Sequence, residues 1–201
     1  MIAILDYDAG NIKSVEKAFG ILGEETILTR DFSVIEKADR LVLPGVGSFA
    51  DAMEHLKKYE LDKAIKDYVQ SGKPFIGICL GLQLLFESSE ESPGVEGLHL
   101  LDGVVKRIPD RPGIKVPHIG WNSLDFPNKG KLFEGIDEGS FVYFVHSYYL
   151  DAKDKDIVTA TTDYSAKIEA SVESGNVFAC QFHPEKSAEV GMQILRNFTQ
   201  V

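Results

Sequence analysis

The chain has 201 residues, and 21 Lys plus Arg against 31 Asp plus Glu give a net charge of −10. This acidic balance argues against nucleic acid or an anionic membrane as a partner. The hydrophobic share of 44% and the charged share of 26% are typical of a soluble globular protein, and the length predicts one domain over residues 1–201. Two cysteines make no disulfide framework, and no apolar run reaches membrane-spanning length. We therefore expect a soluble, cytoplasmic protein.

The first half of the chain alternates short apolar runs with segments that have helical periodicity. Strands are predicted at residues 2–5, 25–29, 40–43 and 75–78. Helices are predicted at residues 12–22, 49–56, 61–69 and 80–86. This order predicts an α/β fold, in which a mostly parallel open sheet is covered by helices on both faces.

The pattern changes after Glu87, where a polar, turn-like stretch runs to Gly97. Several β segments with short connections follow, at residues 104–108, 114–119, 141–150, 157–161, 166–172 and 177–182. A helix with one apolar face closes the chain at residues 188–198. The second half therefore predicts a small antiparallel or mixed β layer, and no linker separates it from the first half.

The stretch around Cys79 places a thiol where a buried strand turns into a helix. Gly77 and Gly81 flank the turn, where the backbone must pass closely. This Gly-x-Cys-x-Gly frame follows the nucleophile elbow of hydrolases, with Cys in place of Ser. The start of a helix favours the thiolate form. A lone cysteine is often inert packing, but in this frame we predict a nucleophile.

A cysteine nucleophile needs a base, and the base needs a group that orients it. The five histidines are candidates, and His183 is favoured because Pro184 biases it toward extended backbone. Residues two apart in an extended chain project to the same side, so Glu185 is placed to hold the imidazole. The alternative is that His183 only ends a surface strand. Cys180 is predicted to point to the opposite face, into the core.

Metal and nucleotide chemistry are disfavoured by the spacing of the candidate ligands. Cys79, Cys180, His183 and Glu185 form neither a Cys-x-x-Cys nor a His-Glu-x-x-His pattern. The glycine-rich loop at residues 44–47 lacks the Walker lysine and the dinucleotide spacing. We predict no metal and no cofactor.

Two groups of backbone N–H donors are placed to hold an oxyanion. One is the N–H of Leu80, at the start of the helix after the nucleophile. The other is the Gly45-Val46-Gly47 loop, at the carboxyl end of a neighbouring strand, where sites form in open α/β sheets. The alternative for this loop is a simple tight turn.

Three ordered motifs resemble the class I (triad) glutamine amidotransferases: Pro44-Gly45-Val46-Gly47, the stretch 77–83 and Phe182-His183-Pro184-Glu185. The resemblance implies that the cysteine attacks the side-chain amide of L-glutamine. It also implies that the histidine serves as general base and then acid, oriented by the glutamate.

The stretches 6–11, 117–122, 143–148 and 183–187 are similar to one branch of this family, the glutaminase subunits of imidazole glycerol phosphate synthase. In that branch a heterodimer forms with a separate (β/α)8 cyclase, which uses the ammonia to make imidazole glycerol phosphate and AICAR in histidine biosynthesis. The departures are small. Ser147 and Leu82 are conservative, and Cys180 stands where an aliphatic residue is expected.

The resemblance also assigns the remaining site residues. The implied glutamine-binding set is Gly45, Val46, Gly47, Leu80, Gln83, Glu91, His146, Ser147 and Tyr148. The implied cyclase-facing set is Asn11, Trp121, Asn122, Tyr143 and Lys186. Trp121 and Tyr143 have an alternative role as core aromatics, since aromatic residues serve both cores and interfaces.

Three other functions remain open from the sequence. They are another triad glutaminase, such as that of pyridoxal phosphate synthase, a free-standing γ-glutamyl cysteine hydrolase, and a non-catalytic thiol protein. A hypothesis on control accompanies the favoured one. The Gly45–Val46 peptide points the wrong way until the cyclase is loaded, so that the isolated chain is nearly idle.

Overall fold

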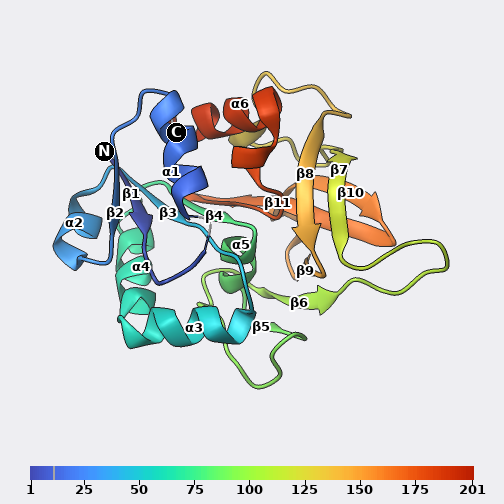
Figure 1. Cartoon of the computed structure of the whole chain (residues 1–201), viewed down its shortest axis with the longest axis horizontal. Coiled ribbons are helices and arrows are strands. Elements are labelled where there is room, and N and C mark those ends of the chain that lie inside the picture. Colours follow the sequence, from blue (N-terminus) through green and yellow to red (C-terminus); the bar gives the residue numbers. More distant parts are fainter. Residues whose placement is uncertain (11) are drawn as a thin grey trace.

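The computed structural model describes residues 1–10 and 12–201 (Figure 1). Its main sheet has the strand order β2-β1-β3-β4-β12-β11-β9-β6-β5, and β10 pairs with β11. The first five strands of this order are mutually parallel. They are β2 (Thr26–Thr29), β1 (Ile2–Leu5), β3 (Arg40–Leu43), β4 (Phe75–Ile78) and β12 (Val177–Cys180). The last strand of the chain therefore lies beside the strand that leads into Cys79.

The rest of the main sheet is mostly antiparallel. It contains β5 (Ser88–Ser89), β6 (Gly103–Arg107), β9 (Tyr148–Ala152), β10 (Val158–Tyr164) and β11 (Ala166–Ser174). A separate antiparallel pair is formed by β7 (His118–Ser123) and β8 (Phe141–His146). The predicted combination of a mostly parallel open sheet with a small mixed β layer is confirmed.

Helices cover both faces of the parallel strands, with α1 and α6 on one side and α3 and α4 on the other (Figure 1). Their bounds are α1 (Ile12–Ile21), α2 (Phe32–Lys37), α3 (Phe49–Lys58), α4 (Leu61–Gln70), α5 (Leu80–Leu84) and α6 (Ala188–Phe198). Short 3-10 turns occupy Lys131–Phe133, Lys155–Ile157 and Pro184–Lys186. Within the described part of the chain, every helix is too short or too polar to span a bilayer.

Several predicted boundaries differ from the structure. The strand predicted at 114–119 lies at 118–123, and the predicted strand 141–150 is two strands interrupted at Ser147. Helix α2 was not predicted because it is short and buries only Ile35, so it carries no helical period. It is fixed locally instead, since the carboxylate of Asp31 accepts a hydrogen bond of 2.8 Å from the Ser33 N–H.

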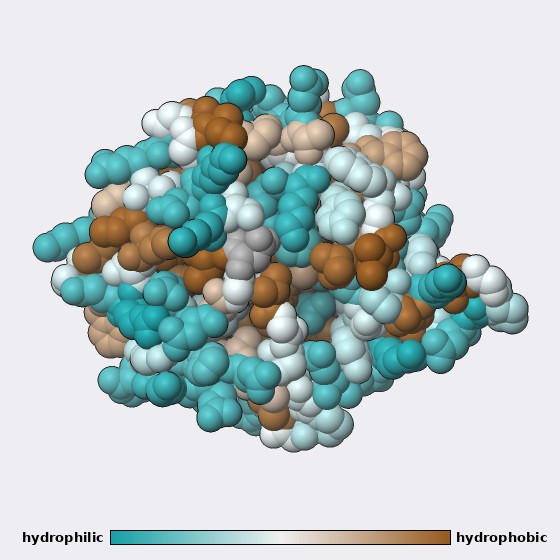
Figure 2. Space-filling model, in the orientation of Figure 1, coloured by the Kyte–Doolittle hydropathy of each residue, from teal (hydrophilic) through white to brown (hydrophobic). Residues whose placement is uncertain are grey.

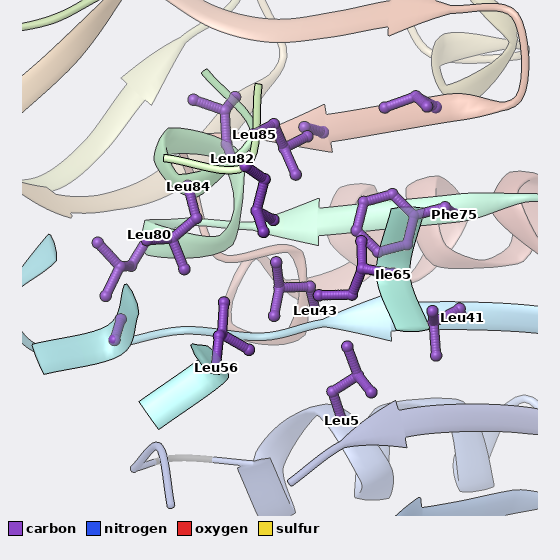
Figure 3. Packing of buried hydrophobic residues seen from close by; sticks show 14 of the residues in the cluster. Leu5, Leu41, Leu43, Leu56, Ile65, Phe75, Leu80, Leu82, Leu84 and Leu85 are labelled. Atoms are coloured by element: carbon purple, nitrogen blue, oxygen red, sulfur yellow. The ribbon is translucent and has the colours of Figure 1, made fainter. Parts of the chain in front are cut away.

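Apolar side chains from the parallel strands pack against the helices on each face. In Figure 3, Leu5, Leu41 and Leu43 of the sheet face Leu56 and Ile65 of the helices, and all five are fully buried. Burial of such side chains is the main favourable term in folding. This packing holds β1, β3 and β4 in register, and it thereby fixes the loops at their carboxyl ends.

Candidate active site

Cys79 lies at a strained turn between β4 and α5. Its φ of 56° and ψ of −108° are unusual for a residue with a side chain. A Cβ on Gly81 would lie 2.1 Å from the carbonyl oxygen of Leu43, so only glycine lets α5 approach β3 this closely. The predicted elbow is therefore present, and it presents the thiol at the carboxyl edge of the sheet.

His183 and Glu185 follow β12 and lie beside the thiol. The Nδ1 atom of His183 lies 2.8 Å from the Oε1 atom of Glu185, and both side chains are buried. The His183 backbone N–H donates to the carbonyl oxygen of Tyr143 at 2.9 Å, which fixes this segment against β8. With Nδ1 engaged by the carboxylate, the ring has Nε2 left for the nucleophile. This is the arrangement of a nucleophile, a base and an orienting carboxylate.

The protonation of His183 is set by these two neighbours. Burial by itself lowers the pKa of the ring, but hydrogen bonds with the Cys79 side chain and with Glu185 outweigh it and raise the pKa to about 9. The imidazolium form of His183 is therefore favoured at neutral pH. A ring in this form is ready to act as a general acid.

A cavity of about 260 Å³ opens over Cys79 and His183. Its lining contains most of the residues that the sequence assigns to glutamine: Val46, Gly47, Leu80, Gln83, Glu91, His146, Ser147 and Tyr148. Gly45 lines a separate small cavity that also touches His183 and Glu185. The structure therefore gathers most of the predicted set around one thiol, although the residues come from four separate stretches of the chain.

The Gly45–Val46 peptide holds its carbonyl, and not its N–H, toward the nucleophile turn. The Leu80 N–H donates to the carbonyl oxygen of Gly45 at 3.4 Å. The Tyr7 hydroxyl donates to the carbonyl oxygen of Pro44 at 2.7 Å, and a Cβ on Gly45 would lie 2.7 Å from that hydroxyl oxygen. Burial, and then the Cys79 charge, raise the pKa of Tyr7, which keeps it a donor. In this conformation one of the two predicted oxyanion donors is already occupied.

A pair of buried histidines lies beside the cavity wall: His146 lines the cavity, and His118 lies behind it. The Nδ1 atom of His118 lies 2.9 Å from the Nε2 atom of His146, whose Nδ1 donates to the carbonyl oxygen of Tyr148 at 2.8 Å. Because a carbonyl only accepts, His146 carries its proton on Nδ1 and His118 donates to it. Burial lowers the pKa of His118 to about 4 and that of His146 to about 3. Both rings are therefore neutral and hold the 146–148 segment in place.

Three residues at the site carry no prediction from the sequence: Tyr7, Val145 and Gln181. Val145 lines the cavity, Tyr7 supports the glycine loop, and the side-chain amide of Gln181 reaches Cys79. Gln181 carries a signal that was available, because it precedes His183 by two residues and an extended chain places both on one side. Tyr7 carries no such signal, since its contact with Pro44 spans two strands.

Trp121 and Tyr143, two of the residues assigned to a partner, lie opposite each other on the paired strands β7 and β8. Trp121 is 51% exposed and meets the half-buried Tyr143 edge-on, with ring centroids 6.1 Å apart. The core alternative is therefore wrong for Trp121. Together with the exposed Ile119 and Phe141, these two rings form an apolar strip. Figure 2, which has the orientation of Figure 1, shows apolar side chains in the region of β7 and β8.

The other assigned partner residues are polar. Lys186 is exposed in the 184–186 turn, and Asn122 is partly buried, donating from its amide to the carbonyl oxygen of Asp163 at 3.1 Å. Asn11 lies outside the described residues.

Cys180 is fully buried on the apolar side of β12, as predicted. Burial, followed by the charges of Glu185 and Cys79, raises the pKa of its thiol, so Cys180 stays a neutral packing residue. Over residues 1–10 and 12–201, no cluster of His, Cys, Asp or Glu is arranged to hold a metal ion.

The model of the glutamine amidotransferase class-I family matches residues 3–201. The chain belongs to this family. This amidotransferase is an enzyme, and the structure brings together the three residues that the sequence analysis names as its triad, Cys79, His183 and Glu185.

Curated relatives narrow the group. The imidazole glycerol phosphate synthase subunit HisH of Moorella thermoacetica is 50% identical over 200 residues, covering 100% of this chain and 94% of the relative. The HisH subunit of Methanothermobacter thermautotrophicus is 50% identical over 201 residues, covering 100% of this chain and 98% of the relative.

Solved structures agree on the fold of the amidotransferase. A crystal structure of a glutamine amidotransferase has a TM-score of 0.77 at 20% identity, covering 99% of this chain and 97% of that chain. PurLQS from Thermotoga maritima has a TM-score of 0.77 at 21% identity, with the same coverages of 99% and 97%.

Proposed function

We propose that this chain is the glutaminase subunit of imidazole glycerol phosphate synthase. It hydrolyses L-glutamine to glutamate and ammonia, and the ammonia passes to a (β/α)8 cyclase subunit that makes imidazole glycerol phosphate and AICAR. The observation that carries the proposal is the cavity of about 260 Å³ that Cys79 and His183 line, with Glu185 2.8 Å behind the imidazole. The HisH relatives support the assignment to this synthase.

The proposed reaction uses the triad in two steps. The Cys79 thiolate attacks the amide carbon of glutamine, and His183 gives its proton to the nitrogen, which leaves as ammonia. The ring then takes a proton from water, whose oxygen attacks the thioester carbon and releases glutamate and the thiolate. Glu185 holds the imidazole in one orientation through both steps. Gln83, Glu91 and the backbone of 146–148 hold the glutamine.

The proposed docking face for the cyclase is the strip on β7 and β8, with Trp121, Asn122 and Tyr143. Lys186, exposed in the 184–186 turn, is proposed to join this face, and Asn11 is assigned to it by the resemblance alone. Exposed aromatic residues are typical anchors of protein interfaces. The carbonyl oxygen of Tyr143 also accepts the hydrogen bond from the His183 N–H. A partner docked on β8 would therefore contact the strand that fixes the backbone of the base. We further propose that residues 1–201 act as one cytoplasmic domain.

Control is proposed to act through the Gly45–Val46 peptide. While the Gly45 carbonyl accepts the Leu80 N–H at 3.4 Å, this donor cannot serve an oxyanion. Rotation of the peptide would remove the carbonyl and present the Val46 N–H instead. Glycine at 45 tolerates the change of backbone angles. The isolated chain is then nearly idle, and the loaded cyclase favours the rotated form.

The test is ammonia release from glutamine by the purified chain, alone and with a cyclase holding its ribonucleotide ligand. We expect slow release by the chain alone, at least about 100-fold faster release with the loaded cyclase, and none above background with Cys79→Ala in either mixture. Fast release that the cyclase does not change would contradict the gating and the assignment to this synthase. Activity that survives in Cys79→Ala would overturn the nucleophile itself.

A further inference from the structure

Gln181 is fully buried two residues before the base, and it contacts the nucleophile directly. Its Nε2 atom lies 3.8 Å from the sulfur of Cys79, within hydrogen-bonding range for sulfur. It belongs to neither the triad nor the glutamine-binding set described above. A buried amide at this position needs an explanation, because burying a polar group without a partner costs free energy.

The direction of the Gln181 amide is fixed by a chain of hydrogen bonds that ends on the backbone. Nε2 of Gln83 lies 3.1 Å from the carbonyl oxygen of Tyr148, and a carbonyl can only accept. The nitrogen end of the Gln83 amide must therefore face Tyr148. The same nitrogen donates its second hydrogen to Oε1 of Gln181 at 3.0 Å. With its oxygen committed to Gln83, Gln181 turns its NH₂ group to the sulfur.

We propose that Gln181 is a further catalytic residue, which donates a hydrogen bond from Nε2 to the Cys79 thiolate and stabilises it. The inference rests on the proposed function, in which this thiolate is the attacking group. Hydrogen bonds to an ionised partner are stronger than those between neutral groups. Gln181 therefore favours the charged sulfur of the free enzyme over the neutral sulfur of the thioester.

This hydrogen bond acts twice in the catalytic cycle. It holds the thiolate ready before glutamine binds, together with the positive charge on His183. It also stabilises the sulfur as a leaving group when water breaks the carbon–sulfur bond of the thioester. Gln83 has a double role, since the amide that lines the glutamine cavity also orients Gln181.

The test uses the rate at which iodoacetamide alkylates Cys79, measured against pH, because the thiolate is the reactive form. Gln181→Met removes the donor at similar volume. Gln181→Glu keeps an acceptor for Gln83 but turns a carboxylate oxygen toward the sulfur. Gln70→Met, at the exposed end of α4, is the matched control. Circular dichroism at each pH restricts the comparison to folded protein.

We expect the acidic limb of the alkylation profile to move up by about one pH unit in Gln181→Met, and further in Gln181→Glu. On that limb the rate falls about tenfold, and Gln70→Met matches the unmodified chain. The kcat of the complex with the loaded cyclase falls by a similar factor, with little change in KM for glutamine. A folded Gln181→Met variant whose profile is unchanged would refute the proposal, even if its Tm were lower.

A measurement on the unmodified chain decides the case in which neither variant folds. The side-chain amide of Gln181, labelled with ¹⁵N, should change its proton shift when Cys79 is alkylated, and an unchanged shift would overturn the proposal. Alkylation needs no glutamine turnover, so these results stand apart from the glutaminase assay. An inactive chain with the expected alkylation shift would contradict the proposed function and leave the role of Gln181 intact.

Discussion

The surroundings of the buried histidines shift their pKa values in opposite directions. Cys79 and Glu185 hold His183 in its charged form, against the effect of its burial, with a pKa of about 9. The hydrogen bonds that link His118, His146 and the Tyr148 carbonyl involve no carboxylate, and burial keeps both rings neutral. One type of side chain therefore supplies both an acid and a rigid neutral support within one site.

The neutral pair predicts a loss of stability in acid. The folded pKa values of about 4 and about 3 lie below the ordinary 6.5, so the unfolded chain binds more protons in this range. The stability that the two rings contribute is complete above pH 6.5 and is lost as the pH falls toward 4. We expect each ring to remove about 1.4 kcal/mol of unfolding free energy per pH unit between these values.

Urea unfolding at pH 7.5, 6 and 5 measures this slope. His146→Gln keeps a donor for the Tyr148 carbonyl but does not titrate, so its slope should be smaller by about 1.4 kcal/mol per pH unit. His55→Gln, on a partly exposed ring of α3, serves as the control. Equal slopes in His146→Gln and the unmodified chain would contradict the assigned protonation. The contribution of His183 to the free energy of unfolding has the opposite pH dependence, because it is lost only as the pH rises through about 9.

At the scale of elements, the contact between β3 and α5 decides where the nucleophile lies. Gly81 packs on the carbonyl of Leu43, and Gly45 packs under the Tyr7 hydroxyl. These glycines set the distance between the nucleophile turn and the Gly45–Gly47 loop. The elbow therefore depends on backbone packing across two strands as much as on its own sequence.

This contact predicts that Gly81→Ala is destabilising. The new Cβ would lie 2.1 Å from the Leu43 carbonyl oxygen, so the two backbones must separate, at a cost of about 1–3 kcal/mol. Gly20→Ala is the matched control, because it lies in helix α1 with nothing within 4 Å of its Cβ, and it should stabilise by about 0.5–1 kcal/mol. Urea unfolding gives both values. A Gly81→Ala variant with an unchanged free energy of unfolding would show that the contact can open without cost.

At the scale of the whole molecule, the β7–β8 pair stands outside the main sheet and carries an exposed apolar strip. Trp121, Ile119 and Phe141 expose half or more of their surface there. The same pair reaches inward, since Tyr143 holds the backbone of His183 and His146 lines the cavity. A partner on the outer side of the pair would therefore contact the elements that hold the triad.

This arrangement predicts that Trp121→Ala weakens cyclase binding by about 2 kcal/mol, a rise in Kd of about 30-fold. The free energy of unfolding should change little, because the ring is 51% exposed. Phe32→Ala, on α2 at the other side of Figure 1, removes a ring that is 45% exposed and should leave Kd unchanged. Titration calorimetry measures both. Equal Kd values for the two variants would place the docking face elsewhere.

The sequence by itself determined the alternation of strands and helices in the first half, because buried strands and amphipathic helices have local hydrophobic periods. It also predicted the triad, because the elbow frame at 77–81 and the spacing of His183 and Glu185 are local signals that a family resemblance then supported. Strand boundaries in the second half were less accurate. The break at Ser147 follows from the pairing of β8 with β7 and of β9 with β6, which no local period encodes.

Only the tertiary structure decided which distant groups meet. Gln181 contacts Cys79 because β12 pairs with β4, and Tyr7 contacts Pro44 because β1 pairs with β3. The occupied Leu80 N–H and the neutral histidine pair likewise depend on loops from separate elements. Contacts of this kind arise from the order of the strands in the sheet, and a linear sequence carries no periodic signal for that order.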